Sequence, residues 1–154
     1  MANVSTTPAG YHTVTLYLTV KGAAAAVDFY KAAFGASEVM RLEMGPGMIG
    51  HAEVKIGDSH VMLSDEFPDM GVVGPKTLGG TASSATIYSE DCDALIARAV
   101  AAGAKLLRPA QNQFYGDRMG QIEDPFGHRW SISTHLEDLS VDEIKARMAK
   151  QFGG

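Results

Sequence analysis

The sequence predicts an α+β fold in which two tandem βαβββ modules form cupped mixed sheets with helices outside, followed by a C-terminal helix. Three observations lead to this class. Apolar residues alternate with polar ones in several short runs, they recur at helical spacing in two longer segments, and glycine-containing turns separate these segments. The order of the segments then repeats, which indicates a duplicated module.

The first module is expected over residues 11–65. It opens with alternating residues typical of a strand over 13–20. Apolar residues at helical spacing follow over 23–34, and Gly35 comes where a helix commonly needs a left-handed residue to end. Three further strands are expected at residues 38–44, 48–56 and 59–64.

Residues 66–81 are rich in proline and glycine, which disfavour the interiors of helices and strands, so we expect a connector loop there. The second module follows over residues 82–136. Its strands are expected at residues 83–89, 105–109, 117–123 and 129–134. Its helix is expected over residues 91–102, with one apolar face made of Cys92, Leu95, Ala99 and Ala102.

The two ends of the chain differ in character. Residues 1–10 are small and polar, which predicts a flexible arm rather than a secretory signal. Residues 137–154 should hold the C-terminal helix and tail. Ser140 and Glu143 have the spacing of a capping box ahead of an amphipathic helix over 141–152.

The composition of the chain indicates which kinds of partner and which cellular compartment to expect. The net charge is −5 and no basic cluster is present, so we expect no nucleic-acid partner. No apolar run is long enough to span a bilayer, so we expect no membrane partner. Cys92 is the only cysteine, which rules out an internal disulfide and suits a reducing cytoplasm.

Several phrases in the sequence resemble one known superfamily. The second module ends in Asp-Pro-Phe-Gly-His-Arg-Trp over residues 124–130, and residues 29–36, 62–68 and 113–118 carry further characteristic phrases. Together with the tandem modules, they resemble the vicinal oxygen chelate superfamily of glyoxalases, bleomycin-resistance proteins and extradiol dioxygenases. Within it, the phrases are similar to the demethylubiquinone-methyltransferase-like or phosphonate-operon-like branch.

The resemblance implies four metal-ligand positions, normally His or Glu, on the first and last strands of each module. Carried over to this sequence, they fall on Thr15, Met62 (or its neighbour Leu63), Ser84 and Ser131. Hydroxyl and thioether groups are poor ligands for the divalent metals of such enzymes. We therefore expect no metal and no other cofactor.

The function expected first is metal-free binding of a small, partly apolar molecule in the cup. The ligand-binding candidates comprise these inward hydroxyls, aromatic or thioether side chains, and a polar-aromatic segment before the seventh strand. They are Thr15, Tyr17, Met62, Ser84, Tyr88, Gln113, Tyr115, Arg118 and Ser131. An equally open interpretation pairs Asp117 with Arg118 locally, without a ligand. Phe67 and Met70 are further candidates for an apolar, adaptable wall.

Two alternatives stay open. The chain could be a metal-dependent lyase, isomerase or dioxygenase with relocated ligands drawn from His51, Glu53, His60 and His135. It could instead be an interaction subunit whose cup is filled by its own side chains. The resemblance also implies a homodimer, with or without exchange of modules. The sequence does not decide whether a reaction is catalysed.

Overall fold

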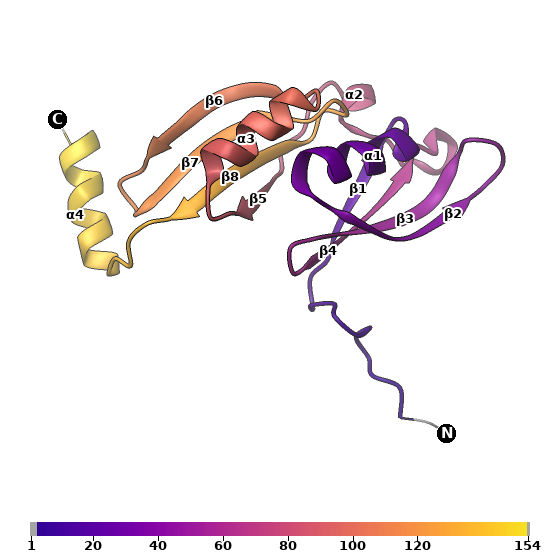
Figure 1. Ribbon diagram of the computed structural model, residues 1–154, viewed down its shortest axis with the longest axis horizontal. Coiled ribbons are helices and arrows are strands. Elements are labelled where there is room, and N and C mark those ends of the chain that lie inside the picture. The colour runs from indigo at the N-terminus through magenta and orange to yellow at the C-terminus, as the bar shows by residue number, and fades with distance from the viewer. Residues whose placement is uncertain (1–2, 154) are drawn as a thin grey trace. The chain divides into compact units, whose positions relative to one another are not determined.

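The computed structural model describes residues 3–153 and divides into two compact units, with the boundary between Gly80 and Thr81 (Figure 1). Residues 1–2 and 154, at the ends of the expected arm and tail, lie outside the described residues. Each unit has a four-stranded mixed sheet and the order β-α-β-β-β, so the predicted fold class is confirmed.

The first unit contains one sheet and one long helix. In chain order its elements are β1 (Leu16–Val20), α1 (Ala23–Phe34), β2 (Ser37–Glu43), β3 (Ile49–Ile56) and β4 (Ser59–Asp65). The sheet has the strand order β1-β4-β3-β2. β1 runs parallel to β4, whereas β3 is antiparallel to both β4 and β2.

One face of this sheet packs on α1 and forms the core of the unit. Leu18, Val54 and Leu63 point to this side and are buried, as are Val27 and Tyr30 of the helix. α1 ends as predicted, because Gly35 adopts the left-handed conformation and its N–H bonds the carbonyl of Lys31. The opposite face, which carries Tyr17, Thr19, His51, Glu53 and Ser64, is called the pocket face below.

The start of α1 is held by a buried carboxylate that the sequence did not reveal. Asp65, the last residue of β4, accepts hydrogen bonds from the backbone N–H groups of Gly22 and Ala23, both at 2.8 Å. It also accepts one from Ile49 at 2.7 Å. One side chain therefore joins α1, β3 and β4 below the pocket face.

The second unit repeats this plan and adds a helix. In chain order its elements are β5 (Ser84–Tyr88), α3 (Cys92–Ala101), β6 (Lys105–Asn112), β7 (Asp117–Glu123), β8 (Arg129–His135) and α4 (Val141–Phe152). The strand order is β5-β8-β7-β6, and Ile122, Trp130 and Ile132 are buried at its core. The capping box of Ser140 and Glu143 at the start of α4 is confirmed.

The repeat extends to the pairing of individual residues. Leu18 lies beside Leu63 in the first sheet, and Ile87 lies beside Ile132 in the second, with the same length of chain between partners. This match makes Met62 equivalent to Ser131, and Thr15 equivalent to Ser84. The four positions at which the resemblance implies metal ligands therefore form two equivalent pairs, one residue of each pair in each unit.

Four local expectations are corrected. β1 begins at Leu16 rather than residue 13, because its pairing with β4 starts there. The buried face of α3 uses Ile96 where Leu95 was expected. β6 continues past Pro109 to Asn112, which an edge strand with shifted register tolerates. The connector holds two short helices, η1 (Pro68–Met70) and α2 (Pro75–Leu78), since proline is compatible with a first helical turn.

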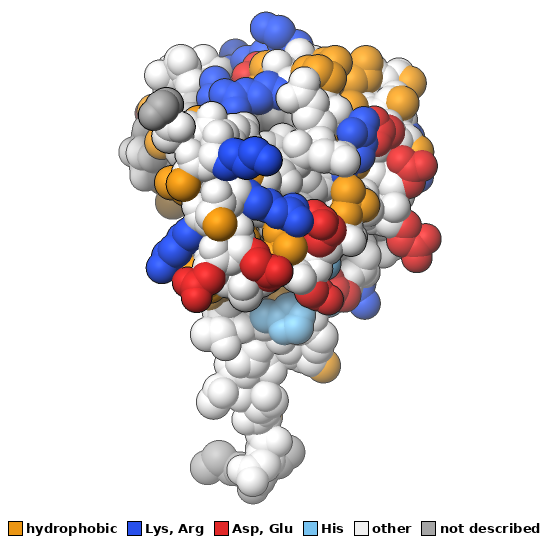
Figure 2. Space-filling model, turned by 90° about the vertical axis from the view of Figure 1, so that its left-hand side faces the viewer, with side chains coloured by type: hydrophobic (Ala, Val, Ile, Leu, Met, Phe, Trp, Pro, Cys, Tyr) orange, Lys and Arg blue, Asp and Glu red, His pale blue; other side chains and the backbone are white. Residues whose placement is uncertain are grey.

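The surface shown in Figure 2 mixes both signs of charge. Lys and Arg side chains are interspersed with Asp and Glu, and neither sign fills a continuous area of this face. Among the described residues, no helix is both long and apolar enough to cross a membrane.

Candidate functional site

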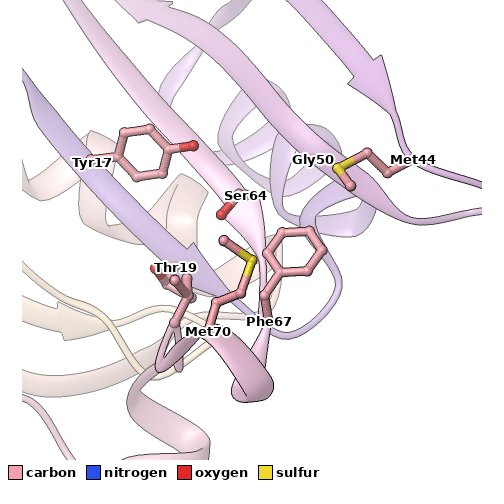
Figure 3. A pocket seen from close by; sticks show the side chains of 8 residues that line it. Tyr17, Thr19, Met44, Gly50, Ser64, Phe67 and Met70 are labelled. Atoms are coloured by element: carbon pink, nitrogen blue, oxygen red, sulfur yellow. The ribbon is translucent and has the colours of Figure 1, made fainter.

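A pocket of about 480 Å³ opens on the pocket face of the first unit (Figure 3). Its walls combine thioethers, aromatic rings and three hydroxyl groups, one of which is the phenol of Tyr17. The lining residues are Tyr17, Thr19, Met44, Gly50, Ser64, Phe67, Met70 and Val72. The volume lies within the range of about 300–1,000 Å³ that is usual for small-molecule sites.

The floor of the pocket comes from the pleat of adjacent strands. Thr19 of β1 lies beside Ser64 of β4, and Tyr17 beside Met62, so all four side chains share one face. Ser64 is buried and its hydroxyl donates to the carbonyl of Asp65 at 3.0 Å. Thr19 and Ser64 were not among the predicted site residues, although their alternation with Tyr17 and Met62 was visible in the sequence.

One wall comes from the connector rather than from the sheet. Phe67 and Val72 form an isolated antiparallel bridge that closes the turn around η1, and Figure 3 shows the Phe67 and Met70 side chains next to Ser64. Glu66 fixes the other end of the turn, because its carboxylate accepts a 2.7 Å hydrogen bond from the N–H of Gly74. The connector is therefore part of the pocket.

The close approach of the connector to β1 depends on a glycine. A Cβ atom placed on Gly74 would lie 2.7 Å from the carbonyl oxygen of Thr19, a backbone atom that cannot move aside easily.

Hydrogen bonding to Thr77 first, and then to Gly74, lowers the pKa of the Glu66 carboxyl. The ionised carboxylate thus suits its role as an acceptor at this point.

A chain of hydrogen bonds crosses the pocket face beside the pocket. The hydroxyl of Tyr17 lies 2.9 Å from Nδ1 of His51, and Nε2 of His51 lies 2.9 Å from the Glu53 carboxylate. The other carboxylate oxygen accepts a hydrogen bond from the hydroxyl of Tyr11. The Tyr11 ring stacks on His60 with centroids 3.9 Å apart. Tyr17 is thus both a wall of the pocket and the end of a polar chain.

The second unit has its own polar cluster. Buried Asp117 accepts from the Tyr88 hydroxyl at 3.2 Å and lies 2.7 Å from Nδ1 of His135, whose Nε2 lies 2.9 Å from Asp138. The bond to Asp138, followed by that to Asp117, raises the pKa of His135. The negative charge of Asp117 raises the pKa of Tyr88. This cluster ties β5, β7 and β8 to the segment before α4.

The polar-aromatic segment before β7 is dispersed over both faces. Arg118 points toward α3, where its guanidinium donates two hydrogen bonds to the Asp93 carboxylate. The Nε–Oδ2 distance is 2.6 Å and the Nη2–Oδ1 distance is 3.0 Å, so Arg118 pairs with Asp93 and not with Asp117. The Gln113 side chain donates to the carbonyl of Gln111. Tyr115 packs edge-on against Phe114, and burial raises its pKa.

The four positions at which the resemblance implies metal ligands carry side chains that do not suit a metal centre. Thr15 precedes β1 and directs its hydroxyl to the carbonyl of His12, and Met62 lies between Tyr17 and Glu53 in the first sheet. Ser84 begins β5, and Ser131 lies between Thr86 and Gln121 in the second sheet. Hydroxyl oxygens and a thioether are not a donor set for Zn²⁺, Ni²⁺ or Fe²⁺.

The residues considered for relocated ligands have other partners. His51 and Glu53 are bonded to each other, His60 is stacked on Tyr11, and His135 is held between two aspartates of the second unit. Over residues 3–153, no group of three or more His, Cys, Asp and Glu side chains is arranged to hold a metal ion.

Comparison with known proteins identifies the family. The model of the Glyoxalase/Bleomycin resistance protein/Dioxygenase superfamily matches residues 11–132. The chain belongs to this superfamily. An uncharacterized protein of Mycobacterium bovis is 39% identical over 141 residues, which cover 90% of this chain and 93% of the relative.

Solved structures of the superfamily share the fold. A glyoxalase-related enzyme from Fulvimarina pelagi is 25% identical, with a TM-score of 0.62, and the match covers 80% of this chain and 87% of that one. A PhnB protein from Bacillus cereus is 19% identical, with a TM-score of 0.62, over 80% of this chain and 99% of that one. The second likeness concerns the fold alone.

Proposed function

We propose that the protein binds a small, partly apolar molecule in the pocket of the first unit and that it does so without a metal. The observation that carries this proposal is the pocket itself, because its lining joins an adaptable apolar wall to a few polar groups. Met44, Met70 and Phe67 suit the body of a ligand, whereas Thr19 and Ser64 offer hydroxyls that can orient it.

The chemistry of the positions at which the resemblance implies metal ligands supports the metal-free part of the proposal. Superfamily enzymes use His and Glu at positions that here hold Thr15, Met62, Ser84 and Ser131. The alternative of a metal-dependent enzyme with relocated ligands is not favoured, because His51, Glu53 and His60 are engaged in contacts among protein groups. Elemental analysis of untagged, natively purified protein tests this part, and a stoichiometric bound metal would contradict it.

A pair of methionine variants tests the pocket. Met70 is 78% exposed and lines the pocket, whereas Met148 is 51% exposed and lies on α4 in the second unit. A panel of small aromatic alcohols and ketones is screened by the concentration dependence of the melting temperature. For a compound that binds, Met70→Ala should weaken binding about three- to ten-fold, given about 0.8 kcal/mol per methylene removed from the contact.

Met148→Ala is the matched control and should leave the affinity unchanged. Neither variant removes a core residue, so both should fold. The proposal fails if no compound in the panel raises the melting temperature, or if both variants weaken binding equally.

The assembly and the compartment are part of the same proposal. We propose a cytoplasmic homodimer, in line with the family resemblance and the single cysteine. α4 has no buried residue within its chain, and exposes Val141, Met148 and Phe152. Sedimentation equilibrium of the full chain tests the dimer, and a monomer at micromolar concentration would contradict it.

A further inference from the structure

The pocket face carries three side chains in the arrangement of an acid–base array. Tyr17, His51 and Glu53 are connected by two hydrogen bonds of 2.9 Å each, and they come from β1 and β3. The Glu53 side chain is only 12% exposed and is held from its other oxygen by Tyr11. The carboxylate is therefore fixed in place behind the imidazole.

The carboxylate also sets which nitrogen of His51 carries the proton. An ionised carboxylate only accepts hydrogen bonds, so Nε2 of His51 donates to Glu53. In the neutral imidazole Nδ1 is then a bare acceptor, and the Tyr17 hydroxyl donates to it. This arrangement leaves lone pairs on the Tyr17 oxygen free to accept a hydrogen bond from a further group.

That further group would lie in the pocket, because Tyr17 lines it (Figure 3). We infer that Tyr17, His51 and Glu53 accept a proton from the bound molecule, and that the ligand class is an aromatic or similarly flat molecule with an acidic O–H. This inference rests on the proposed function, since it assigns the chemistry of the molecule held in the same pocket.

The proton transfer balances without any other reactant. The ligand O–H bond breaks and its proton moves to the Tyr17 oxygen, while the Tyr17 proton moves to Nδ1 of His51. The products are a ligand oxyanion, neutral Tyr17 and an imidazolium that Glu53 stabilises. No electron is transferred. Such an array follows the general rule that a base within hydrogen-bond reach is oriented by a third group.

The titratable groups around the array come from each neighbouring segment. Tyr11 bonds Glu53 from the N-terminal segment, and His60 of β4 stacks on Tyr11 while its Nδ1 lies 3.1 Å from the carbonyl of Gly10. Met62 separates Tyr17 from Glu53 in the sheet and carries no charge. Besides Tyr17 and His51 themselves, the titratable groups nearest Glu53 in this set are therefore Tyr11, which bonds it directly, and His60, which stacks on Tyr11.

The experiment uses 4-nitrophenol, whose phenolate absorbs visible light, and 4-nitroanisole, which has the same ring but no acidic proton. Binding of both is followed by thermal shift. The phenolate fraction of bound 4-nitrophenol is followed by absorbance, at a pH where the free probe is mostly protonated. In the natural sequence we expect the phenolate fraction to rise about ten-fold on binding, equivalent to one pKa unit of the probe.

Three variants then locate the proton acceptor. His51→Gln and Tyr17→Phe should abolish the rise in phenolate, while 4-nitroanisole binds to His51→Gln within about two-fold of its original affinity. His128→Gln, in the turn after β7, is the matched control and should keep the full rise. Circular dichroism confirms that each variant is folded.

The outcomes separate the two proposals. If both probes bind but the phenolate fraction does not rise, or still rises in His51→Gln, the proton-accepting role is overturned and the binding function stands. If neither probe binds, the pocket does not take flat aromatic molecules and this inference falls. The wider compound panel then decides the proposed function separately.

Discussion

The indole N–H of Trp130 donates a 2.9 Å hydrogen bond to the carboxylate of Asp124, and both side chains are buried. The other carboxylate oxygen accepts from the backbone N–H groups of Phe126 and His128. The Asp-Pro-Phe-Gly-His-Arg-Trp phrase is therefore a turn that fixes β7 and β8 to each other. The hydrogen bonds of this phrase stabilise the second unit, and none of its residues lines the pocket of the first unit.

Replacing this carboxylate should destabilise the second unit. Asp124 is 2% exposed, so Asp124→Ala leaves buried donors without their acceptor. We expect a loss of about 3 kcal/mol in the free energy of unfolding, measured by urea denaturation. Asp142→Ala, at an exposed position in the first turn of α4, should cost under about 0.5 kcal/mol. Equal losses in the two variants would contradict the role given to Asp124.

Two strand glycines should respond differently to the same substitution. In Gly120→Ala the new Cβ would lie 2.6 Å from Cδ1 of Ile96 and 2.9 Å from the backbone nitrogen of Ala110. Because the strand backbone cannot yield, we expect a loss of about 1–3 kcal/mol in the free energy of unfolding.

In Gly50→Ala the new Cβ would instead meet Sδ of Met44 at 2.5 Å, at the end of a flexible and exposed side chain. The free energy of unfolding should change by less than about 0.5 kcal/mol. Since Met44 and Gly50 both line the pocket, ligand affinity should change while stability does not. A stability loss as large as that of Gly120→Ala would show that Met44 is fixed in place.

His135 should make stability depend on pH. Its hydrogen bonds to Asp138 and Asp117 raise its pKa above the ordinary value of 6.5 in the folded state. A group whose pKa is raised by folding stabilises the folded state when it is protonated. This stabilisation is complete at a pH below the unfolded-state pKa, and it is lost as the pH rises through the folded-state pKa. The melting temperatures of the natural protein and His135→Gln should differ most just below pH 6.5 and converge at higher pH. A constant difference across this window would contradict the assignment.

Cys92 should be unreactive in the folded protein. Its side chain is 1% exposed at the start of α3, so a thiol reagent reaches it only when the unit opens. Labelling with a chromogenic disulfide should therefore be slow without denaturant and accelerate in parallel with unfolding. Rapid labelling of the native protein would show that the N-terminal turn of α3 opens locally.

The sequence predicted the strands and long helices because each has a regular pattern of apolar residues. α1 and α4 have the predicted bounds, and β7 does as well. The first residue of β1 could not be predicted from the sequence. The alternation of apolar and polar residues already includes Thr13 and Thr15, whereas pairing with β4 begins only at Leu16. Alternation of apolar and polar residues indicates that the backbone is extended. It does not show at which residue hydrogen bonding to a neighbouring strand begins.

The candidate site was less predictable than the fold, for two physical reasons. Phe67, Met70 and Val72 reach the pocket through a proline-rich turn, and no periodic pattern specifies its path. The bond between Tyr17 and His51 joins β1 to β3 across β4, so it depends on the registers of two strand pairs. The shared face of His51 and Glu53 was visible in their spacing, whereas their direct contact required the structure.

The matching register of the two sheets has an evolutionary consequence. Glu53 and His51 in the first unit are equivalent to Gln121 and Met119 in the second, where the same backbone carries an amide and a thioether. After an ancestral half was copied, each copy could lose or gain polar groups independently, because the backbone pairing of the other was unaffected. The two halves therefore share one backbone plan and carry different polar side chains at equivalent positions of their sheets.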